Sequence, residues 1–448
     1  MKICLVQCPS LTNHSPLLGL AYINAALKTA GHEVHIKDFS ADKSDTVFEN
    51  DPASFKANLD KSVNSVLETE AEVVGFSVWE TNFRESLLLA KEIKKKNARI
   101  TTVFGGPHCT FFGRELIQDV NVDAVVVGEG EETIVELLGS LTEDGRIVPC
   151  PGVLVKSGGS VLDGGRRPEI KAVDSLSFPD YRGFEIDRYI HKDHIFSIAF
   201  SRGCIRKCKF CTNPASWESF RRRSAKQVTK EMRWQKECFP ELHKLEVQGA
   251  AINLDIEMLS ELCDEIIRTG LNIKWGGSLL IRKEMTAELI AKMAKAGCNC
   301  LGFSLESGSQ KIVDSMGKGF QIADADRIIK AAHEAGIETI LTLIVGFPGE
   351  TQSDFSETMS FIERNKTNIS WMTTPSECVA LKNSYISDHP DEMGIELSQN
   401  GTTYWRSKDG SNTHEERQRR LAVLKEFAES EGLTVDAFNT IHLRNMKQ

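Results

Sequence analysis

The chain has 448 residues, of which 41% are hydrophobic and 26% are charged. This length and composition predict two or three globular domains, which excludes a single small binding module and a disordered protein. Its 63 acidic and 54 basic residues give a net charge of -9, which argues against a protein that binds nucleic acid through its phosphates.

No apolar run reaches the roughly 18 to 20 residues that cross a bilayer. Residues 1–16 lack the small-residue cleavage site of a signal peptide. We therefore expect a cytoplasmic protein without a membrane span. In such a chain the twelve cysteines should be reduced, and clustered ones should hold metal or take part in redox chemistry.

The first part of the chain alternates apolar strands with amphipathic helices. The predicted strands cover residues 2–8, 32–39, 71–78, 98–106 and 122–128. This order predicts a doubly wound, Rossmann-like α/β domain over residues 1–145. Because such sheets bind ligands beyond the carboxyl ends of their strands, a ligand site is predicted along residues 9–19, 77–82, 105–109 and 128–131.

Residues 146–192 are irregular and rich in glycine, and predict a linker. Six further strand candidates alternate with helices, at residues 195–203, 245–252, 273–281, 298–308, 339–347 and 370–381. They predict a partial (β/α)6 TIM-like barrel over residues 193–382. Residues 383–448 predict a small carboxy-terminal cap, with a helix that begins in a capping box formed by Thr413 and Glu416.

Three cysteines, Cys204, Cys208 and Cys211, follow the first barrel strand in the segment SRGCIRKCKFCTNP. A structural zinc site usually has four protein ligands, whereas three cysteines can hold a 4Fe-4S cluster and leave one iron open. The spacing favours the cluster, and zinc or three unrelated thiols are the alternatives. The nearby basic residues, Arg202, Arg206, Lys207, Lys209 and residues 221–223, are either a solvated face or a source of positive charge for the cluster.

A cysteine triplet with this spacing on a six-unit barrel resembles the radical S-adenosylmethionine enzymes. The resemblance implies that the open iron binds S-adenosylmethionine, whose cleavage gives a 5'-deoxyadenosyl radical. It places Phe210 and Gly346 near the adenine and Glu306 near the ribose, although loop packing is the alternative for Phe210. Relatives often have acidic residues after the second strand; here the segment is VQGAAIN, which leaves Gln248 and Gly249 to hold the methionine amino group.

The first domain lacks the G-x-G-x-x-G order of a dinucleotide site. Its segments SPLLGLAYINAALKTAGHEV, VFGGPHCTFF and VDAVVVGEGEET, placed ahead of the barrel, resemble the cobalamin-binding radical S-adenosylmethionine enzymes over residues 3–430. The resemblance implies a cobalamin site that includes Ser77, Gly105, Gly106, His108, Gly128 and Gly130, with fold-serving turns as the alternative for the glycines. Because a D-x-H-x-x-G segment is absent, His108 is not expected to bind cobalt.

The resemblance implies a methyltransferase that acts on an unactivated carbon or a phosphinate of a small molecule, lipid or peptide. A flavodoxin- or ferredoxin-type protein would supply electrons. Radical rearrangement, cyclisation or ring contraction is the first alternative. An RNA methylthiotransferase fits poorly with the acidic chain, and a cobalamin sensor or carrier fits poorly with the intact cysteines. Tyr404 and Trp405 are candidates for the substrate cavity wall. Cys378 on the last strand is expected to pack in the core, with a thiol that faces the active cavity as the alternative.

Overall fold

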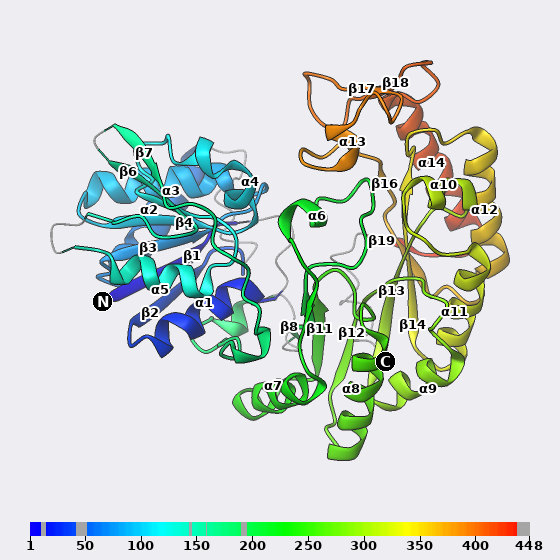
Figure 1. The fold of residues 1–448 in the computed structure, drawn as a ribbon, viewed down its shortest axis with the longest axis horizontal. Helices are drawn as coiled ribbons and strands as arrows, with labels where there is room; N and C mark the ends of the chain where they lie inside the picture. Colours follow the sequence, from blue (N-terminus) through cyan, green and yellow to red (C-terminus); the bar gives the residue numbers. More distant parts are fainter. Residues whose placement is uncertain (10–14, 42–51, 143–145, 158, 190–194, 437–448) are drawn as a thin grey trace. The chain divides into compact units, whose positions relative to one another are not determined.

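The protein is described by a computed structural model that covers residues 1–9, 15–41, 52–142, 146–157, 159–189 and 195–436. Residues 10–14 of the predicted ligand edge and residues 437–448 of the predicted cap lie outside this description. The chain divides into two compact units, Met1–Ser197 and Ile198–Gln448 (Figure 1). No described helix is long and apolar enough to cross a membrane.

The first unit is built on one sheet, which has seven strands within the described residues, in the order β2-β1-β3-β4-β5-β6-β7. The strands that pair in parallel are β1 (Lys2–Gln7), β2 (Glu33–Asp38), β3 (Val73–Ser77), β4 (Thr101–Gly105) and β5 (Ala124–Val126). The central strands are apolar along their length because helices cover both faces of the sheet. This arrangement confirms the predicted doubly wound domain.

Helices α1 (Leu18–Thr29) and α5 (Glu131–Gly139) lie on one face of this sheet (Figure 1). The other face is covered by α2 (Pro52–Leu67), α3 (Phe83–Lys96) and α4 (Pro107–Leu116). The core between the sheet and these three helices includes Val6, Val74, Val63 and Leu89, all buried.

The stretch expected to be a linker carries regular structure. Strands β6 (Val153–Ser157) and β7 (Ser160–Asp163) form a hairpin that pairs antiparallel with β5. The hairpin forms because a buried apolar run is followed by glycine at a turn, and Gly159 has a φ of +83°. Farther on, the Asn24 amide on α1 donates to the Asp180 carbonyl at 2.8 Å. Much of this stretch therefore belongs to the first unit.

The second unit is an open barrel of mainly parallel strands. Its sheet has eight strands among the described residues, in the order β19-β15-β14-β13-β12-β11-β8, with β16 also paired to β14. The strands are β8 (Ile195–Ala199), β11 (Lys244–Gln248), β12 (Lys274–Leu279), β13 (Cys298–Glu306), β14 (Glu338–Val345), β15 (Trp371–Thr373), β16 (Ser376–Glu377) and β19 (Val435–Asp436). Six of these match the predicted strands, and β19 adds an unpredicted strand beside β15.

The helices of the barrel connect successive strands. They are α7 (Ala225–Cys238), α8 (Ile256–Thr269), α9 (Ala287–Lys295), α10 (Gln310–Ser315), α11 (Ile322–Glu334) and α12 (Gln352–Asn365). The buried residues of α8 recur at helical spacing, as in Leu259, Leu262 and Ile266. The partial barrel is therefore confirmed.

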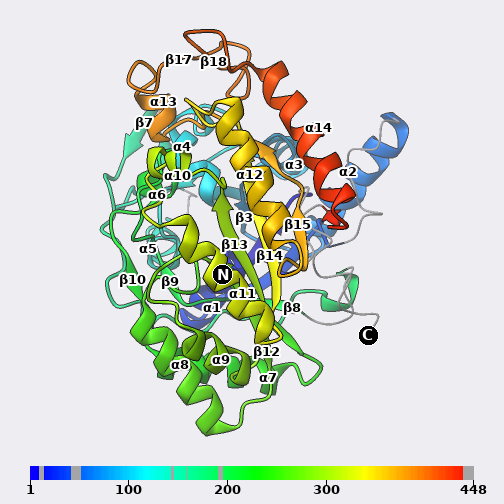
Figure 2. The same ribbon diagram turned by 90° about the vertical axis from the view of Figure 1, so that its right-hand side faces the viewer.

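The cap consists of α13 (Tyr385–Asp388), a hairpin of β17 (Ile395–Glu396) and β18 (Arg406–Ser407), and α14 (His414–Ser430). Helix α14 runs beside α12 on the outside of the barrel (Figure 2). The Thr413 hydroxyl accepts from the Glu416 amide, as the predicted cap requires. The Glu416 side chain instead accepts from Arg419 and Arg420, because both lie one helical turn away.

Candidate cluster and cofactor site

The cysteine loop starts where β8 ends, at the carboxyl edge of the barrel. Short strands β9 (Ser201–Arg202) and β10 (Arg221–Arg222) pair antiparallel and close the base of the loop. Gly203 begins the loop with a φ of +78°, and a Cβ there would lie 2.2 Å from the Ser219 carbonyl oxygen. Only glycine fits this turn, which directs the following residues away from the strand.

Cys204, Cys208 and Cys211 are partly exposed, whereas all the other described cysteines except Cys238 are buried. The Arg206 amide donates to the Cys204 sulfur and the Asn213 amide donates to the Cys211 sulfur, each at 3.4 Å. Donors aimed at sulfur stabilise thiolates, the form that binds metal.

The three sulfurs influence one another electrostatically. Burial, aided by the neighbouring Cys211 and Cys204, raises the pKa of Cys208 to about 11, against the lowering effect of Lys318. Within the described part of the chain, no three His, Cys, Asp or Glu side chains are grouped so that one metal ion could bind them all. Three cysteines suit a 4Fe-4S cluster, in which each binds a different iron, and are one short of the four protein ligands of a structural zinc site.

A buried lysine that the sequence analysis did not single out lies beside these cysteines. The Lys318 ammonium donates to a Glu306 carboxylate oxygen at 2.9 Å and to the Ser304 carbonyl at 2.5 Å. It is 5.9 Å from the centroid of the Phe210 ring, and its charge lowers the pKa of Cys208. The one feature of the sequence that could have drawn attention to Lys318 is its position between two glycines, three residues after the end of α10.

The segment that carries Lys318 is bonded to the cysteine loop. The Lys209 amide donates to the Met316 carbonyl at 3.0 Å, and the Arg206 guanidinium donates to the Gly319 carbonyl at 3.2 Å. Phe210 packs against the apolar core that α10 shares with the cap. The Phe210 ring is therefore held by apolar packing, and its loop is held by hydrogen bonds to the segment that follows α10.

The remaining residues predicted to contact S-adenosylmethionine lie at other strand ends. Glu306 closes β13 at a register shift and has a φ of +69°, a strained value for a residue other than glycine. Gln248 ends β11, Gly249 follows it, and both residues are exposed. A Cβ on Gly249 would lie 3.6 Å from the Ser201 carbonyl oxygen, so Gly249 is close to the base of the cysteine loop.

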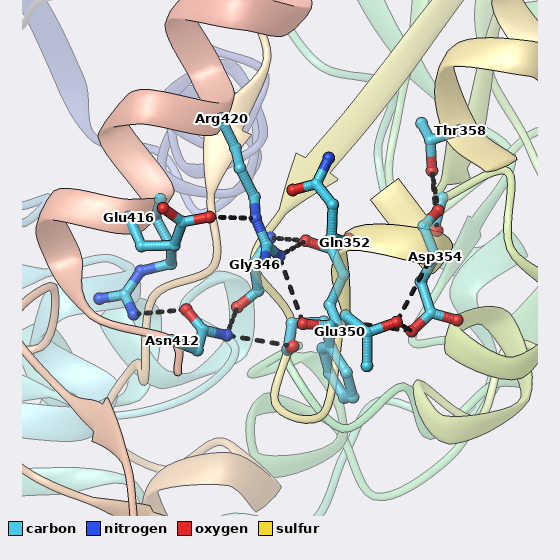
Figure 3. A network of polar contacts seen from close by, with 12 residues as sticks. Gly346, Glu350, Gln352, Asp354, Thr358, Asn412, Glu416 and Arg420 are labelled. Atoms are coloured by element: carbon cyan, nitrogen blue, oxygen red, sulfur yellow. Dashed lines mark hydrogen bonds and ion pairs between the residues drawn. The ribbon is translucent and has the colours of Figure 1, made fainter. Parts of the chain in front are cut away.

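Gly346 lies in a network that connects the end of β14 to α14 (Figure 3). Its amide donates to Glu350 at 2.7 Å, and its carbonyl accepts from the Asn412 side chain at 3.0 Å. Glu350 also accepts from Arg420 at 2.8 Å. Burial raises the pKa of Glu350 to about 6, against the opposing effects of the Gly346 amide and Arg420.

The lack of a side chain at Gly346 is explained by the cap. With its φ of +77°, a Cβ would lie 2.3 Å from the Arg417 Cγ atom. This collision by itself requires glycine here, so the glycine is not evidence for the adenine that the resemblance places beside it. The Gly346 amide is already bonded to Glu350, and its carbonyl keeps a second acceptor position beside the bond from Asn412.

Several basic residues near the cysteines have partners of their own. Arg222 pairs with Asp255 at 3.1 Å, and Arg223 pairs with buried Glu231 at 2.7 Å. The Lys209 ammonium lies 5.2 Å from the centroid of the Tyr385 ring. These contacts tie the loop to the barrel and cap.

The residues predicted to line the substrate cavity or the core, Trp405, Tyr404 and Cys378, differ in how far they are buried. Trp405 is fully buried, donates to the Cys378 carbonyl at 2.8 Å and lies 4.0 Å from the Arg417 guanidinium. It is therefore a core residue of the cap, so its prediction as a cavity wall was wrong. Tyr404 is half exposed. Cys378 is buried in the same apolar core, as predicted.

In the first unit, the residues predicted to hold cobalamin lie at the carboxyl edge of the sheet. Ser77 and Gly105 end adjacent strands. A Cβ on Gly106, which has a φ of +108°, would lie 2.8 Å from the Val78 carbonyl oxygen, so the fold itself requires this glycine. A Cβ on Gly130 would lie 2.8 Å only from the terminal methyl carbon of Ile23, which can move aside.

Gly128, by contrast, has a φ of +82° and open space where a Cβ would be. His108 lies at the start of α4, stacked between Phe83 and Phe112 at centroid distances of 4.7 and 4.6 Å. Burial lowers its pKa. The imidazole is thus held by ring packing, and the expectation that it does not bind cobalt stays a prediction.

Two family models match the chain. The B12 binding domain matches residues 9–138, and the Radical SAM superfamily matches residues 198–362. The first match includes the carboxyl edge of the sheet in the first unit, and the second includes the cysteine loop and most of the barrel.

Curated relatives are similar over most of the chain. An uncharacterized methyltransferase of Pyrococcus horikoshii is 28% identical, over 81% of this chain and 78% of that protein. The cytidylyl-2-hydroxyethylphosphonate methyltransferase of Streptomyces wedmorensis is 26% identical, over 74% and 69%. An anaerobic magnesium-protoporphyrin IX monomethyl ester cyclase of Cereibacter sphaeroides is 27% identical over 77% of this chain, which spans only 55% of the cyclase.

Solved structures share the fold. The radical S-adenosylmethionine methyltransferase TsrM from Kitasatospora setae, with cobalamin and a [4Fe-4S] cluster bound, gives a TM-score of 0.76 at 16% identity, covering 98% of this chain and 97% of TsrM. The cobalamin-dependent radical enzyme OxsB gives 0.75 at 14% identity, covering 96% and 67%. The chain belongs to the cobalamin-binding radical S-adenosylmethionine enzymes, whose cofactors are a 4Fe-4S cluster, S-adenosylmethionine and cobalamin.

Proposed function

We propose that the chain is a methyltransferase of this family, which methylates an unactivated carbon or a phosphinate of a small molecule, lipid or peptide. The observation that carries the proposal is the partly exposed cysteine triplet at the carboxyl edge of a partial barrel, in a chain that also has a B12 binding domain. When bound, the cluster supplies the electron that cleaves S-adenosylmethionine, and cobalamin supplies the methyl carrier.

In this proposal Cys204, Cys208 and Cys211 each bind one iron. The amide donors on Cys204 and Cys211 stabilise their thiolates. Phe210 and Gly346 lie beside the adenine, and Glu306 beside the ribose. Gln248 and Gly249 fit a contact with the methionine part, since both are exposed beside the base of the cysteine loop.

The cobalamin site takes the carboxyl edge of the first sheet, from Ser77 through Gly105, Gly106 and His108 to Gly128 and Gly130. Two glycines of this edge are not required by contacts within the fold. A Cβ on Gly128 would have no neighbour within 4 Å, and a Cβ on Gly105 would lie at an ordinary packing distance of 3.7 Å from the nearest atom. Both positions let the backbone approach a large ligand closely.

Methylation is favoured over the alternatives by two of the relatives, which are named methyltransferases. The name of the Streptomyces wedmorensis relative suggests cytidylyl-2-hydroxyethylphosphonate as one substrate to test first. Radical cyclisation or rearrangement is the second candidate, and the similarity to the magnesium-protoporphyrin cyclase supports it.

A flavodoxin- or ferredoxin-type electron donor is part of the proposal. Lys207 is exposed on the cysteine loop, next to Arg206 and two residues before Lys209. Positive charge around the loop suits the acidic surface of such a donor and would speed their encounter.

The cofactor content of anaerobically reconstituted protein tests the proposal. Wild-type protein should hold about four irons, four sulfides and one cobalamin. Cys208→Ala should lose the iron but keep the cobalamin, whereas Cys238→Ala, a partly exposed cysteine on α7, should keep both. Iron retained by Cys208→Ala, stoichiometric zinc in the wild type, or no cobalamin binding would contradict the assignment.

A further inference from the structure

We propose that Lys318 is the built-in positive charge that offsets the negative charge of the cluster and raises its reduction potential. This inference rests on the proposed function, because it requires a cluster at Cys204, Cys208 and Cys211. It adds a residue that lies outside the cysteine motif and sets how easily the cluster accepts an electron.

The structure holds the Lys318 ammonium in a fixed place. Its side chain is 3% exposed, and its two oxygen partners are a Glu306 carboxylate and the Ser304 carbonyl. The register shift between Ser304 and Glu306 and the left-handed φ of Glu306 accompany this arrangement. An ammonium buried without oxygen partners would cost free energy of folding. The strained backbone at Glu306 accompanies the two partners that offset this cost.

The charge is held close to the cluster ligands. The ammonium lies 5.9 Å from the centroid of the Phe210 ring, and Phe210 directly precedes Cys211. Two hydrogen bonds, from Lys209 to Met316 and from Arg206 to Gly319, fix the two segments to each other. The segment that carries Lys318 is therefore fixed to the loop that carries the cysteines.

Lys318 is the member of the ion pair with Glu306 that contacts the cysteine loop, at the ring of Phe210. The other cations of the loop are less buried: Lys207 is exposed, and Arg206 and Lys209 are partly exposed. Water and salt screen those charges more than the buried one.

A nearby cation favours the more negative form of a redox centre. The cluster gains one negative charge when it takes up an electron, so the reduced state gains more from Lys318 than the oxidised state does. Removal of the cation should make reduction by an electron donor less favourable. The effect concerns the cluster itself and does not require S-adenosylmethionine.

The test is a redox titration of the reconstituted protein followed by electron paramagnetic resonance, without S-adenosylmethionine. Lys318→Met keeps the aliphatic stem and should shift the midpoint potential to a more negative value, whereas Lys318→Arg should stay near the wild type. Lys311→Met is the matched control, since Lys311 also pairs with a carboxylate but is mostly exposed. It should leave the potential unchanged.

Glu306→Gln supplies the opposite perturbation and should shift the potential to a more positive value. If Lys318→Met does not retain a cluster, the test rests on Glu306→Gln. A midpoint potential of Glu306→Gln that is equal to or more negative than that of the wild type overturns the inference. A wild-type potential in Lys318→Met, even with weakened S-adenosylmethionine binding, also overturns it. Iron and sulfide are counted first, because wild-type protein without about four of each would refute the proposed function instead.

Discussion

The ion pair between Arg420 and Glu350 should hold α14 against the barrel. Both side chains are buried, and a guanidinium nitrogen of Arg420 lies 2.8 Å from a carboxylate oxygen of Glu350. Arg420→Met keeps most of the apolar volume but leaves the Glu350 carboxylate buried without its cation. Breaking a buried pair in this way costs about 3–5 kcal/mol.

The cost should depend on pH because Glu350 titrates near pH 6. Burial raises its pKa from 4.5 to about 6, which corresponds to about 2 kcal/mol. A raised carboxyl pKa contributes stability that is fully present below pH 4.5 and is lost as the pH rises through 6. Without Arg420 the pKa should rise further, so the deficit of the variant should be large at pH 7.5 and small at pH 5.

Hydrogen exchange of the α14 amides, followed by mass spectrometry, measures this local cost. At pH 7.5 a loss of 3–5 kcal/mol lowers protection roughly 100- to 5,000-fold. The matched control is Arg419→Met, on the same helix. Arg419 is half exposed and pairs with Glu416, so its loss should cost under about 1 kcal/mol. Equal protection in the two variants, or an Arg420→Met deficit that is the same at both pH values, would refute the reasoning.

His108→Ala should leave the electron paramagnetic resonance spectrum of bound Co(II) cobalamin unchanged, because the imidazole is stacked between two phenylalanines. Nitrogen splitting that is present in the wild type and lost in the variant would contradict this. Gly346→Ala should lower the thermal unfolding temperature, at a cost of roughly 1–3 kcal/mol, because its Cβ would collide with Arg417. Gly349→Ala has a similar φ but open space, so it should cost less; the reverse order would show that the collision is relieved.

The order of the strands was predictable because most of them are buried and therefore appear as short apolar runs separated by amphipathic helices. The β6–β7 hairpin was missed because its glycines were interpreted as marks of a linker, although the apolar run before Gly159 is typical of a strand. Strand β19 is two residues long and has no period to detect.

The candidate site was predictable only where chemistry depends on spacing within one loop, as for Cys204, Cys208 and Cys211. Lys318 reaches these cysteines through a contact between distant segments, and a single lysine carries no sign of such a contact. Trp405 was placed on a cavity wall because its neighbours are polar, yet it is buried by Arg417 from the following helix. Long-range packing decided both cases.

The claim that this chain is a methyltransferase is tested most directly by the co-products of its reaction. The reconstituted protein is incubated anaerobically with a strong reductant, S-adenosylmethionine, cobalamin and each candidate substrate. We expect S-adenosylhomocysteine and 5'-deoxyadenosine to form together with the methylated product, and we expect Cys208→Ala to form no 5'-deoxyadenosine. Substrate consumption with 5'-deoxyadenosine but without S-adenosylhomocysteine would contradict methylation and support a radical rearrangement.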